Sequence, residues 1–267
     1  MSDEQEQPPK DVHGTANVTG DNWGIVVGVN MGTINIIRKP TRYKYDMTTK
    51  TKKQFLELVQ NGDYSIQEVK EYLLNSTEEI QIRLRTLEIY LTVGEHDYSV
   101  LSALGKDISQ NMREGVLRSI IDYKLLDYPH DMLVLNMQDR KKTIAEQAVR
   151  SVDFLIKHRT AHPKLFLVAN IPYHPYWLIR KLAVQSIISA DLQESIELLC
   201  KFKHSKYWVT RRKILDYVEK RHAQDRLTED DTRIAVDILE YYIHDEESSS
   251  NKTRQLAQSI LERITHN

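Results

Sequence analysis

Two windows of this chain follow nearly the same pattern, 31 residues apart. The first reads His174-Pro-Tyr-Trp-Leu-Ile-Arg-Lys-Leu-Ala-Val and the second reads Ser205-Lys-Tyr-Trp-Val-Thr-Arg-Arg-Lys-Ile-Leu. In both, a Tyr-Trp pair stands where a loop passes into a helix, and an arginine follows the tryptophan by three positions. We expect the tryptophan to cover the packed junction and the arginine to reach a neighbouring turn. A unit that recurs at this spacing indicates an array of helical hairpins.

Weaker copies of the unit lie upstream. Arg113-Glu-Gly-Val-Leu-Arg-Ser-Ile and Ala145-Glu-Gln-Ala-Val-Arg-Ser-Val begin 32 residues apart, and a third copy begins at Arg83. From residue 54 onward Gly and Pro are scarce, and apolar residues recur at spacings of three and four, as on one face of a helix. These patterns predict an all-α solenoid over residues 54–267, in which each hairpin buries one face on its neighbours. Residues 240–251 are expected to form a loop that lengthens the last repeat.

The repeated unit resembles the HEAT-repeat family. The matching residues are Trp177-Leu-Ile-Arg180 with Ala183, and Trp208-Val-Thr-Arg211. The resemblance covers roughly residues 55–265. It implies a HEAT-like α-solenoid with a long concave surface and a role in protein–protein interaction, but it does not specify a function, because one fold serves many.

Residues 13–37 differ in composition from the rest of the chain. They hold five of the nine glycines, four asparagines and a run of alternating apolar residues that has the period of a β-strand. The segment contains no proline, and Asp21 is its one Asp, Glu, Lys or Arg residue. Such a segment can stack on copies of itself, with apolar side chains interdigitating and asparagines forming ladders. We therefore expect a short β-forming segment that drives self-assembly.

Part of this segment resembles the amyloid signalling motifs of the RIP homotypic interaction type and their bacterial analogues. Ile25, Val27, Gly28 and Asn30 fit the family's core, and Val26 stands where the family has glutamine. The resemblance implies a signalling or innate-immunity and defence component that pairs with itself or with a protein carrying a similar β motif. The residues expected to mediate self-assembly are Val18, Asn22, Ile25, Val27, Gly28, Val29, Asn30 and Ile34.

Two other interpretations of residues 13–37 remain open: an arm folded onto the first helical repeat, and a small closed β-sheet between a few copies. The flanking regions are simpler. Residues 1–12 are polar and contain two prolines, which predicts disorder. Residues 38–53 hold seven basic residues against one acid, which predicts a basic linker.

The whole-chain composition narrows the class of protein. The net charge is −1, so the overall charge gives no argument for nucleic acid or an acidic membrane. The single cysteine, Cys200, fits a reducing compartment, and because it follows Leu198-Leu199 we expect it to be buried among apolar residues. The acidic N-terminus does not have the pattern of a signal peptide, and no stretch approaches the roughly 20 apolar residues that span a bilayer. We expect a cytoplasmic protein with no membrane span.

A basic and aromatic cluster lies at residues 201–213. Together with the previous repeat it could form a stripe that binds phosphates, with aromatic rings stacking on bases. Its candidate residues for binding a partner or nucleic acid are Arg180, Lys181, Lys203, Lys206, Arg211, Arg212 and Lys213. The alternative is structural, with the tryptophans packing the junctions and the arginines pairing with nearby acids. HEAT-like alkylpurine DNA glycosylases use a similar surface, which makes that activity an outside alternative.

No pattern in the sequence points to catalysis. The chain has no Gly-x-Ser-x-Gly motif, and no phosphate-binding Gly-Lys-[Ser/Thr] follows its glycines. His158 and His162 have a spacing that can hold a metal, but no third ligand is evident, so a solvated helix end is expected. We predict no catalytic residues, no metal and no cofactor. The predicted function is a non-enzymatic scaffold that assembles through its N-terminal motif and binds a partner, a protein or a nucleic acid, through its solenoid.

Overall fold

The computed structural model describes residues 61, 66–92, 96–245 and 250–266, and every regular element within them is helical. The all-α class predicted from the sequence is therefore confirmed for this part of the chain. The predicted N-terminal segment 1–12, assembly segment 13–37 with its eight named residues, and basic linker 38–53 lie outside the described residues. The elements are α2 (Ile66–Leu74), α3 (Ile80–Thr92), α4 (Tyr98–Gly105), α5 (Gln110–Asp122), α6 (His130–Met137), α7 (Lys142–Lys157), α8 (Leu165–Val168), η1 (Ile171–Tyr173), α9 (Trp177–Ala190), α10 (Ser195–Cys200), α11 (Trp208–Ala223), α12 (Glu229–His244) and α13 (Asn251–Thr265).

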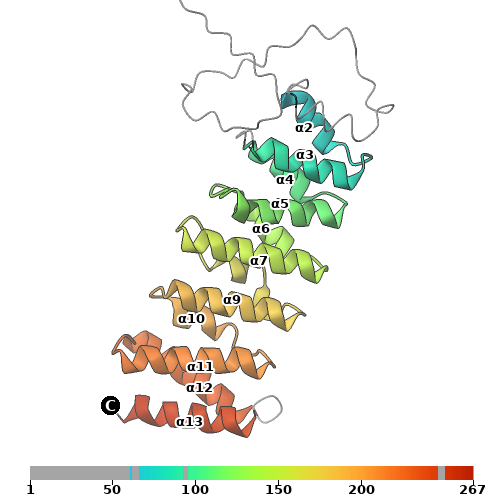
Figure 1. Ribbon diagram of the computed structural model, residues 1–267. Helices are drawn as coiled ribbons and strands as arrows, with labels where there is room; N and C mark the ends of the chain where they lie inside the picture. The colour runs from blue at the N-terminus through green and yellow to red at the C-terminus, as the bar shows by residue number, and fades with distance from the viewer. Residues whose placement is uncertain (1–60, 62–65, 93–95, 246–249, 267) are drawn as a thin grey trace, which may run out of the picture. The chain divides into compact units, whose positions relative to one another are not determined.

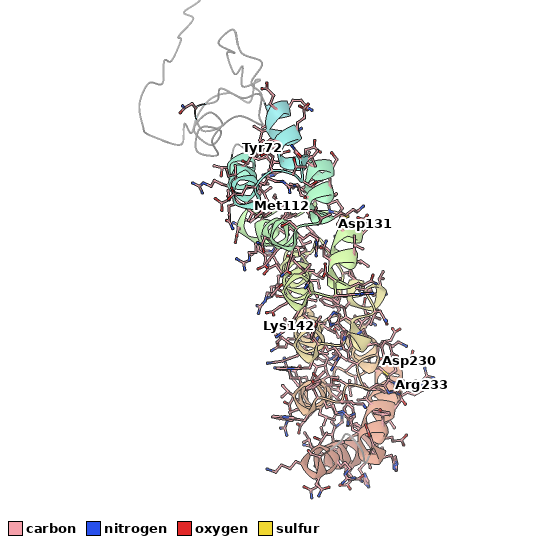
Figure 2. The ribbon with its side chains drawn as sticks, turned by 90° about the vertical axis from the view of Figure 1, so that its right-hand side faces the viewer. Tyr72, Met112, Asp131, Lys142, Asp230 and Arg233 are labelled. Carbon is pink, nitrogen blue, oxygen red and sulfur yellow. The ribbon has the colours of Figure 1, made fainter. Side chains whose placement is uncertain are left out.

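The helices fall into two layers. Each odd-numbered helix from α3 to α11 packs on the next odd-numbered one, and α3, α5, α7, α9 and α13 each also contact an even-numbered helix (Figure 1). Figure 2 shows the layers from the side, with Met112 of α5 and Lys142 of α7 in one and Asp131 of α6 and Asp230 of α12 in the other. The layers are joined by contacts such as those of α6 with α7 and α12 with α13.

The core lies between the layers and is apolar along its length. Helix α7 illustrates how the sequence produces it, because its buried residues recur at spacings of three and four along one face. These residues are Ile144, Ala145, Ala148, Val149, Ser151, Val152, Leu155 and Ile156. The opposite face carries the exposed Arg150 and Lys157, which pair with Glu146 and Asp153 one turn earlier. Burial of this stripe, and not helix propensity alone, holds the helix in place.

The spacing of the helices follows the repeat seen in the sequence. Helices α3, α5, α7, α9 and α11 begin 30 to 35 residues apart, and α13 begins 43 residues after α11. The extra length of the last interval was expected in a loop at 240–251. That expectation was wrong in part, because α12 continues to His244 and is itself 16 residues long, against six for α10. Among the described helices, none is both long and apolar enough to cross a membrane.

Candidate partner-binding site

The turns that enter α5, α7, α9 and α11 share one backbone geometry. Their N-cap residues have φ between −75° and −91° and ψ between 116° and 120°. In each turn, a side chain two residues earlier accepts the N-cap N–H. The four accepting residues are Asp107, Asp139, His174 and Ser205, at distances of 2.8, 2.8, 3.3 and 3.5 Å. The starts of these four odd-numbered helices are thus built alike and differ mainly in the side chains they carry.

In three of these four turns, an arginine one turn into the following helix donates a hydrogen bond to a carbonyl of the turn. Arg113 of α5 donates to the Asp107 carbonyl at 2.6 Å, and Arg211 of α11 donates to the Ser205 carbonyl at 2.5 Å. Arg180 of α9 donates in the same way to the carbonyl of His174. The prediction that the arginine after each tryptophan reaches a neighbouring turn is therefore confirmed.

Arginines at this position also reach forward to the next repeat. Arg83 of α3 lies 2.5 Å from the carboxylate of Asp107, and Arg113 lies 2.9 Å from that of Asp139. Helix α7 has Ala145 at the equivalent position, and the following turn has His174 in place of an aspartate. The arginine and the carboxylate are both absent at this step, whereas α9 keeps Arg180 although the next turn has Ser205 and no aspartate. The pairs that do form have a structural role, since a buried charge is tolerated only when it is paired or hydrogen-bonded.

Two of the seven predicted basic binding residues are consequently interior. Arg180 and Arg211 are 9% and 0% exposed. Besides their carbonyl contacts, the Arg180 guanidinium lies 5.2 Å from the centre of the Tyr207 ring, and that of Arg211 pairs with Asp245 at 2.6 Å. Their charges hold the fold together and are not presented to a partner.

The other five predicted basic residues lie at or near the surface, in differing situations. Lys203 pairs with Asp237 at 2.5 Å, and Arg212 pairs with Asp216 at 2.7 Å. The ammonium of Lys181 lies 5.6 Å from the centre of the Trp177 ring. Lys206 is exposed and Lys213 is half-buried. Within the described residues, Lys181, Lys206 and Lys213 form no ion pair with a carboxylate.

Aromatic side chains stand exposed at the turns that enter α9 and α11. We call this group the aromatic ridge, and its members are Tyr173 (68% exposed), Tyr176 (37%), Trp177 (38%), Tyr207 (40%) and Trp208 (63%). Its two halves meet where the rings of Trp177 and Tyr207 come within 5.5 Å. The Tyr176 hydroxyl extends the ridge by donating to the Arg140 carbonyl at 3.3 Å, in the turn before α7.

The exposure of these rings differs from the sequence expectation. Trp177 and Trp208 are the first residues of α9 and α11, as predicted. Trp208 is 63% exposed, whereas Trp177, 38% exposed, packs on Tyr207 at the next helix start. The interior position at each junction is taken by the arginine one turn later, whose guanidinium satisfies the carbonyl of the turn. A clustered group of exposed aromatic rings on a folded domain is a mark of a binding surface.

The ridge lies among positive charges that, except for Lys203 with Asp237, form no ion pair within the described residues. The turns at 138–142 and 201–208, on either side of the turn that enters α9, carry Arg140, Lys141, Lys142, Lys201, Lys203 and Lys206. Their one acid, Asp139, is already paired with Arg113. The cluster predicted at residues 201–213 contains Lys201, Lys203 and Lys206. The basic residues at 140–142 were not predicted, because their proximity to the aromatic residues depends on the stacking of α7 on α9.

His174 holds the turn that supports the ridge. It is 7% exposed, its Nδ1 accepts the N–H of Tyr176, and its carbonyl accepts from Arg180. Burial lowers the pKa of His174 from its ordinary value, and the positive charge of Arg180 lowers it further. The ring is therefore kept neutral, which is the form in which Nδ1 can accept a hydrogen bond.

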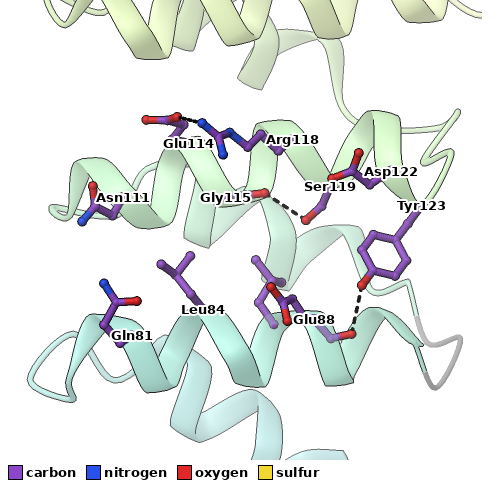
Figure 3. A pocket seen from close by; sticks show the side chains of 11 residues that line it. Gln81, Leu84, Glu88, Asn111, Glu114, Gly115, Arg118, Ser119, Asp122 and Tyr123 are labelled. Atoms are coloured by element: carbon purple, nitrogen blue, oxygen red, sulfur yellow. Dashed lines mark hydrogen bonds and ion pairs between the residues drawn. The ribbon is translucent and has the colours of Figure 1, made fainter.

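A groove of about 610 Å³ lies elsewhere on the domain, between α3 and α5 (Figure 3). Its polar groups bond within the protein: Arg118 pairs with Glu114, and the Ser119 hydroxyl donates to the Gly115 carbonyl at 2.9 Å. The Tyr123 hydroxyl donates to the Glu88 carbonyl at 3.4 Å. The groove is open, and two of its three carboxylates, Glu88 and Glu114, pair with arginines of the same helices.

Other chemistry-bearing residues form contacts within the fold. His162 lies 2.8 Å from Glu194, and His158 contacts the Phe154 carbonyl at 2.9 Å. Within the described residues, no group of three or more metal-binding side chains is present. Cys200 was expected to be buried among apolar residues, but it is half-buried and its sulfur lies 3.5 Å from Asp237. Burial raises its thiol pKa, which keeps it a weak nucleophile.

Comparison with known proteins does not add a function to this geometry. No family model matches the chain, and no curated protein matches it. A solved structure of an engineered protein is similar with a TM-score of 0.38 and 12% identity, covering 80% of this chain and 97% of that one. A TM-score this low carries no argument, so the candidate site rests on its own geometry.

Proposed function

We propose that the protein is a non-enzymatic scaffold, a HEAT-like α-solenoid that binds a macromolecular partner through the aromatic ridge. Residues 13–37 would assemble it with itself or with a protein that carries a similar β motif. The combination suits a signalling or defence component in the cytoplasm, in which assembly concentrates the helical domain and its bound partner.

The exposure of the aromatic ridge is the observation that carries this proposal. The same N-cap backbone at α5 and α7 carries Ser109 and Lys141, so the geometry of the turn does not require an aromatic residue. At α9 and α11 the position is held by Tyr176 and Tyr207, which do not cap the helix with their side chains. N-caps favour small polar residues, and departures from local preference cluster at functional sites.

The chemistry of the ridge supports recognition of a partner. Tryptophan and tyrosine dominate the energetics of protein interfaces, because their rings bury large areas at little cost in conformational entropy. The ridge presents five such rings over adjacent repeats, on rigid helix starts and not on a long loop. Rigid placement limits the ordering cost of binding.

A stability comparison tests whether the ridge is a binding surface or part of the core. In the full-length chain, Trp177→Ala with Trp208→Ala should reduce the free energy of unfolding by no more than about 1.5 kcal/mol, mainly from the lost Trp177–Tyr207 ring contact. The control Phe202→Ala removes a fully buried ring and should cost about 3–5 kcal/mol. Urea unfolding measures both variants, and equal losses would show that the ridge is structural and remove the proposal.

A second candidate function, nucleic-acid binding, is favoured by the basic turns beside the ridge. It concerns the same residues and specifies the chemistry of the partner.

A further inference from the structure

We propose that the partner of the aromatic ridge is single-stranded nucleic acid, with unpaired bases stacked on its rings and phosphates held by the lysines and arginine around it. This inference rests on the proposed function and specifies the partner. Binding of a single strand needs three features: aromatic rings with open faces, positive charges that no carboxylate neutralises, and an arrangement in which rings and charges alternate.

The open faces are available on both halves of the ridge. Trp208 is 63% exposed, and within the described residues no other ring stacks on it. Tyr173 is 68% exposed. The rings of Trp177 and Tyr207 contact each other and are also approached by Lys181 and Arg180, so Trp208 and Tyr173 offer the most open faces. Stacking on a planar ring is available to every base and depends little on sequence. In a duplex the base faces are covered by their neighbours, so these rings favour an unpaired strand.

Positive charges gather around the ridge without carboxylates to neutralise them. Some exposed arginines elsewhere do pair with a carboxylate about one helical turn away, as Arg150 does with Glu146 and Arg233 with Asp230. The cations at the ridge have no carboxylate partner within the described residues. They are Arg140, Lys141, Lys142, Lys181 and Lys206. This local excess exists although the chain as a whole has a net charge of −1, and it suits a polyanion.

The arrangement distinguishes a nucleic acid from an acidic protein. The cations come from the turns before α7 and α11 and from the first part of α9, so they lie on both sides of the rings. Lys181 lies against the face of Trp177, which places a positive charge beside a stacking surface. A strand of nucleotides alternates planar bases with phosphates and can use both elements. A glutamate-rich chain offers charges but no flat aromatic groups to cover the rings.

The rings themselves supply the signal for a test. The chain has three tryptophans, Trp23, Trp177 and Trp208, so Trp23→Phe in the full-length protein leaves fluorescence from the ridge alone. This protein would be titrated with 20-nucleotide oligo(dT) and oligo(U), with a duplex of equal length, and with polyglutamate. We expect both single strands to quench the emission and bind, with the duplex at least about tenfold weaker, since stacking on each base is lost.

Variants then assign the binding to the ridge. Trp208→Ala should weaken oligo(dT) binding about tenfold, whereas Leu135→Ala, an exposed apolar residue of α6, should leave it unchanged. Lys206→Ala should lower the slope of log affinity against log salt concentration by about 0.7, the loss of one phosphate contact. Lys220→Ala, at the far end of α11, should not change the slope.

Each contrary result has a distinct meaning. Binding of polyglutamate without oligonucleotides would overturn this inference and leave the ridge as a protein-binding surface. Equal binding of duplex and single strand, or oligonucleotide binding that survives Trp208→Ala, would overturn it in favour of simple charge attraction, for example to residues 38–53. Absence of all binding by a protein whose ridge variants stay folded would also overturn it, whereas failure of the proposed function itself is detected by the unfolding comparison with Phe202→Ala.

Discussion

The guanidinium of Arg211 lies 2.6 Å from the carboxylate of Asp245, 34 residues later in the chain. The arginine is fully buried and also donates to the Ser205 carbonyl, so it joins the turn before α11 to the end of α12. The sequence pattern predicted that Arg211 lies on a binding surface, but in the fold it is buried and has a structural role.

Arg211→Met is therefore expected to destabilise the protein by about 3–5 kcal/mol, because it removes one partner of a buried ion pair. Arg212→Met is the matched control. Arg212 is the next residue, its side chain is exposed and pairs with Asp216 one turn away, so its loss should cost less than about 1 kcal/mol. Urea unfolding of both variants gives the two values, and similar losses would contradict the structural role of Arg211.

Gly105 marks a close approach between α4 and the residues before α6. A Cβ at this position would lie 2.7 Å from the hydroxyl oxygen of Tyr128, which is buried and has no hydrogen-bond partner. We expect Gly105→Ala to cost about 1–3 kcal/mol through overpacking. In the background Tyr128→Phe, which removes the hydroxyl, the same change should cost clearly less. A double-mutant cycle by thermal unfolding measures the difference, and strict additivity would contradict the contact.

His174 predicts a pH dependence of stability. Its folded-state pKa lies below the ordinary value of 6.5, chiefly because of burial and then because of Arg180. The unfolded chain therefore binds a proton more readily at this residue, and the stability that neutral His174 contributes is present above about pH 6.5 and is lost as the pH falls below it.

His174→Asn should reduce this dependence, since the amide oxygen can accept the Tyr176 N–H and does not titrate. The measurement is the free energy of unfolding at pH 7.5 and pH 5.5 for the wild type and the variant. The wild type should lose more stability over this interval, and equal losses would exclude His174 as the source.

The N-terminal motif is tested by Val27→Asp together with Gly28→Asp in the full-length chain. Two carboxylates in an apolar, stacked segment would repel one another in every layer, so large assemblies that bind thioflavin should disappear. Light scattering and dye fluorescence report the result. The ridge variant Trp177→Ala with Trp208→Ala should still assemble, and assembly that persists in the aspartate variant would contradict the motif.

Much of the helical domain followed from local patterns. The spacing of apolar residues identified the helices, and the Tyr-Trp pairs marked the starts of α9 and α11 at the correct residues. The reach of Arg180 and Arg211 to a neighbouring turn was also predicted, since a long side chain one turn into a helix points back toward its N-terminus. Cys200 and the end of α12 were placed less well, because burial and helix ends depend on neighbours that are distant in sequence.

The sequence by itself determined that this chain forms helices at regular intervals, and where two of them begin, because periodicity and helix-start residues are local properties. Only the tertiary structure decided which side chain of each Trp-x-x-Arg unit is buried. Both residues are large and lie one turn apart, so either could fill a junction. Packing of successive helices leaves a carbonyl inside each turn that needs a donor, and arginine satisfies it with several N–H groups. The tryptophans remain at the surface, where they form the ridge.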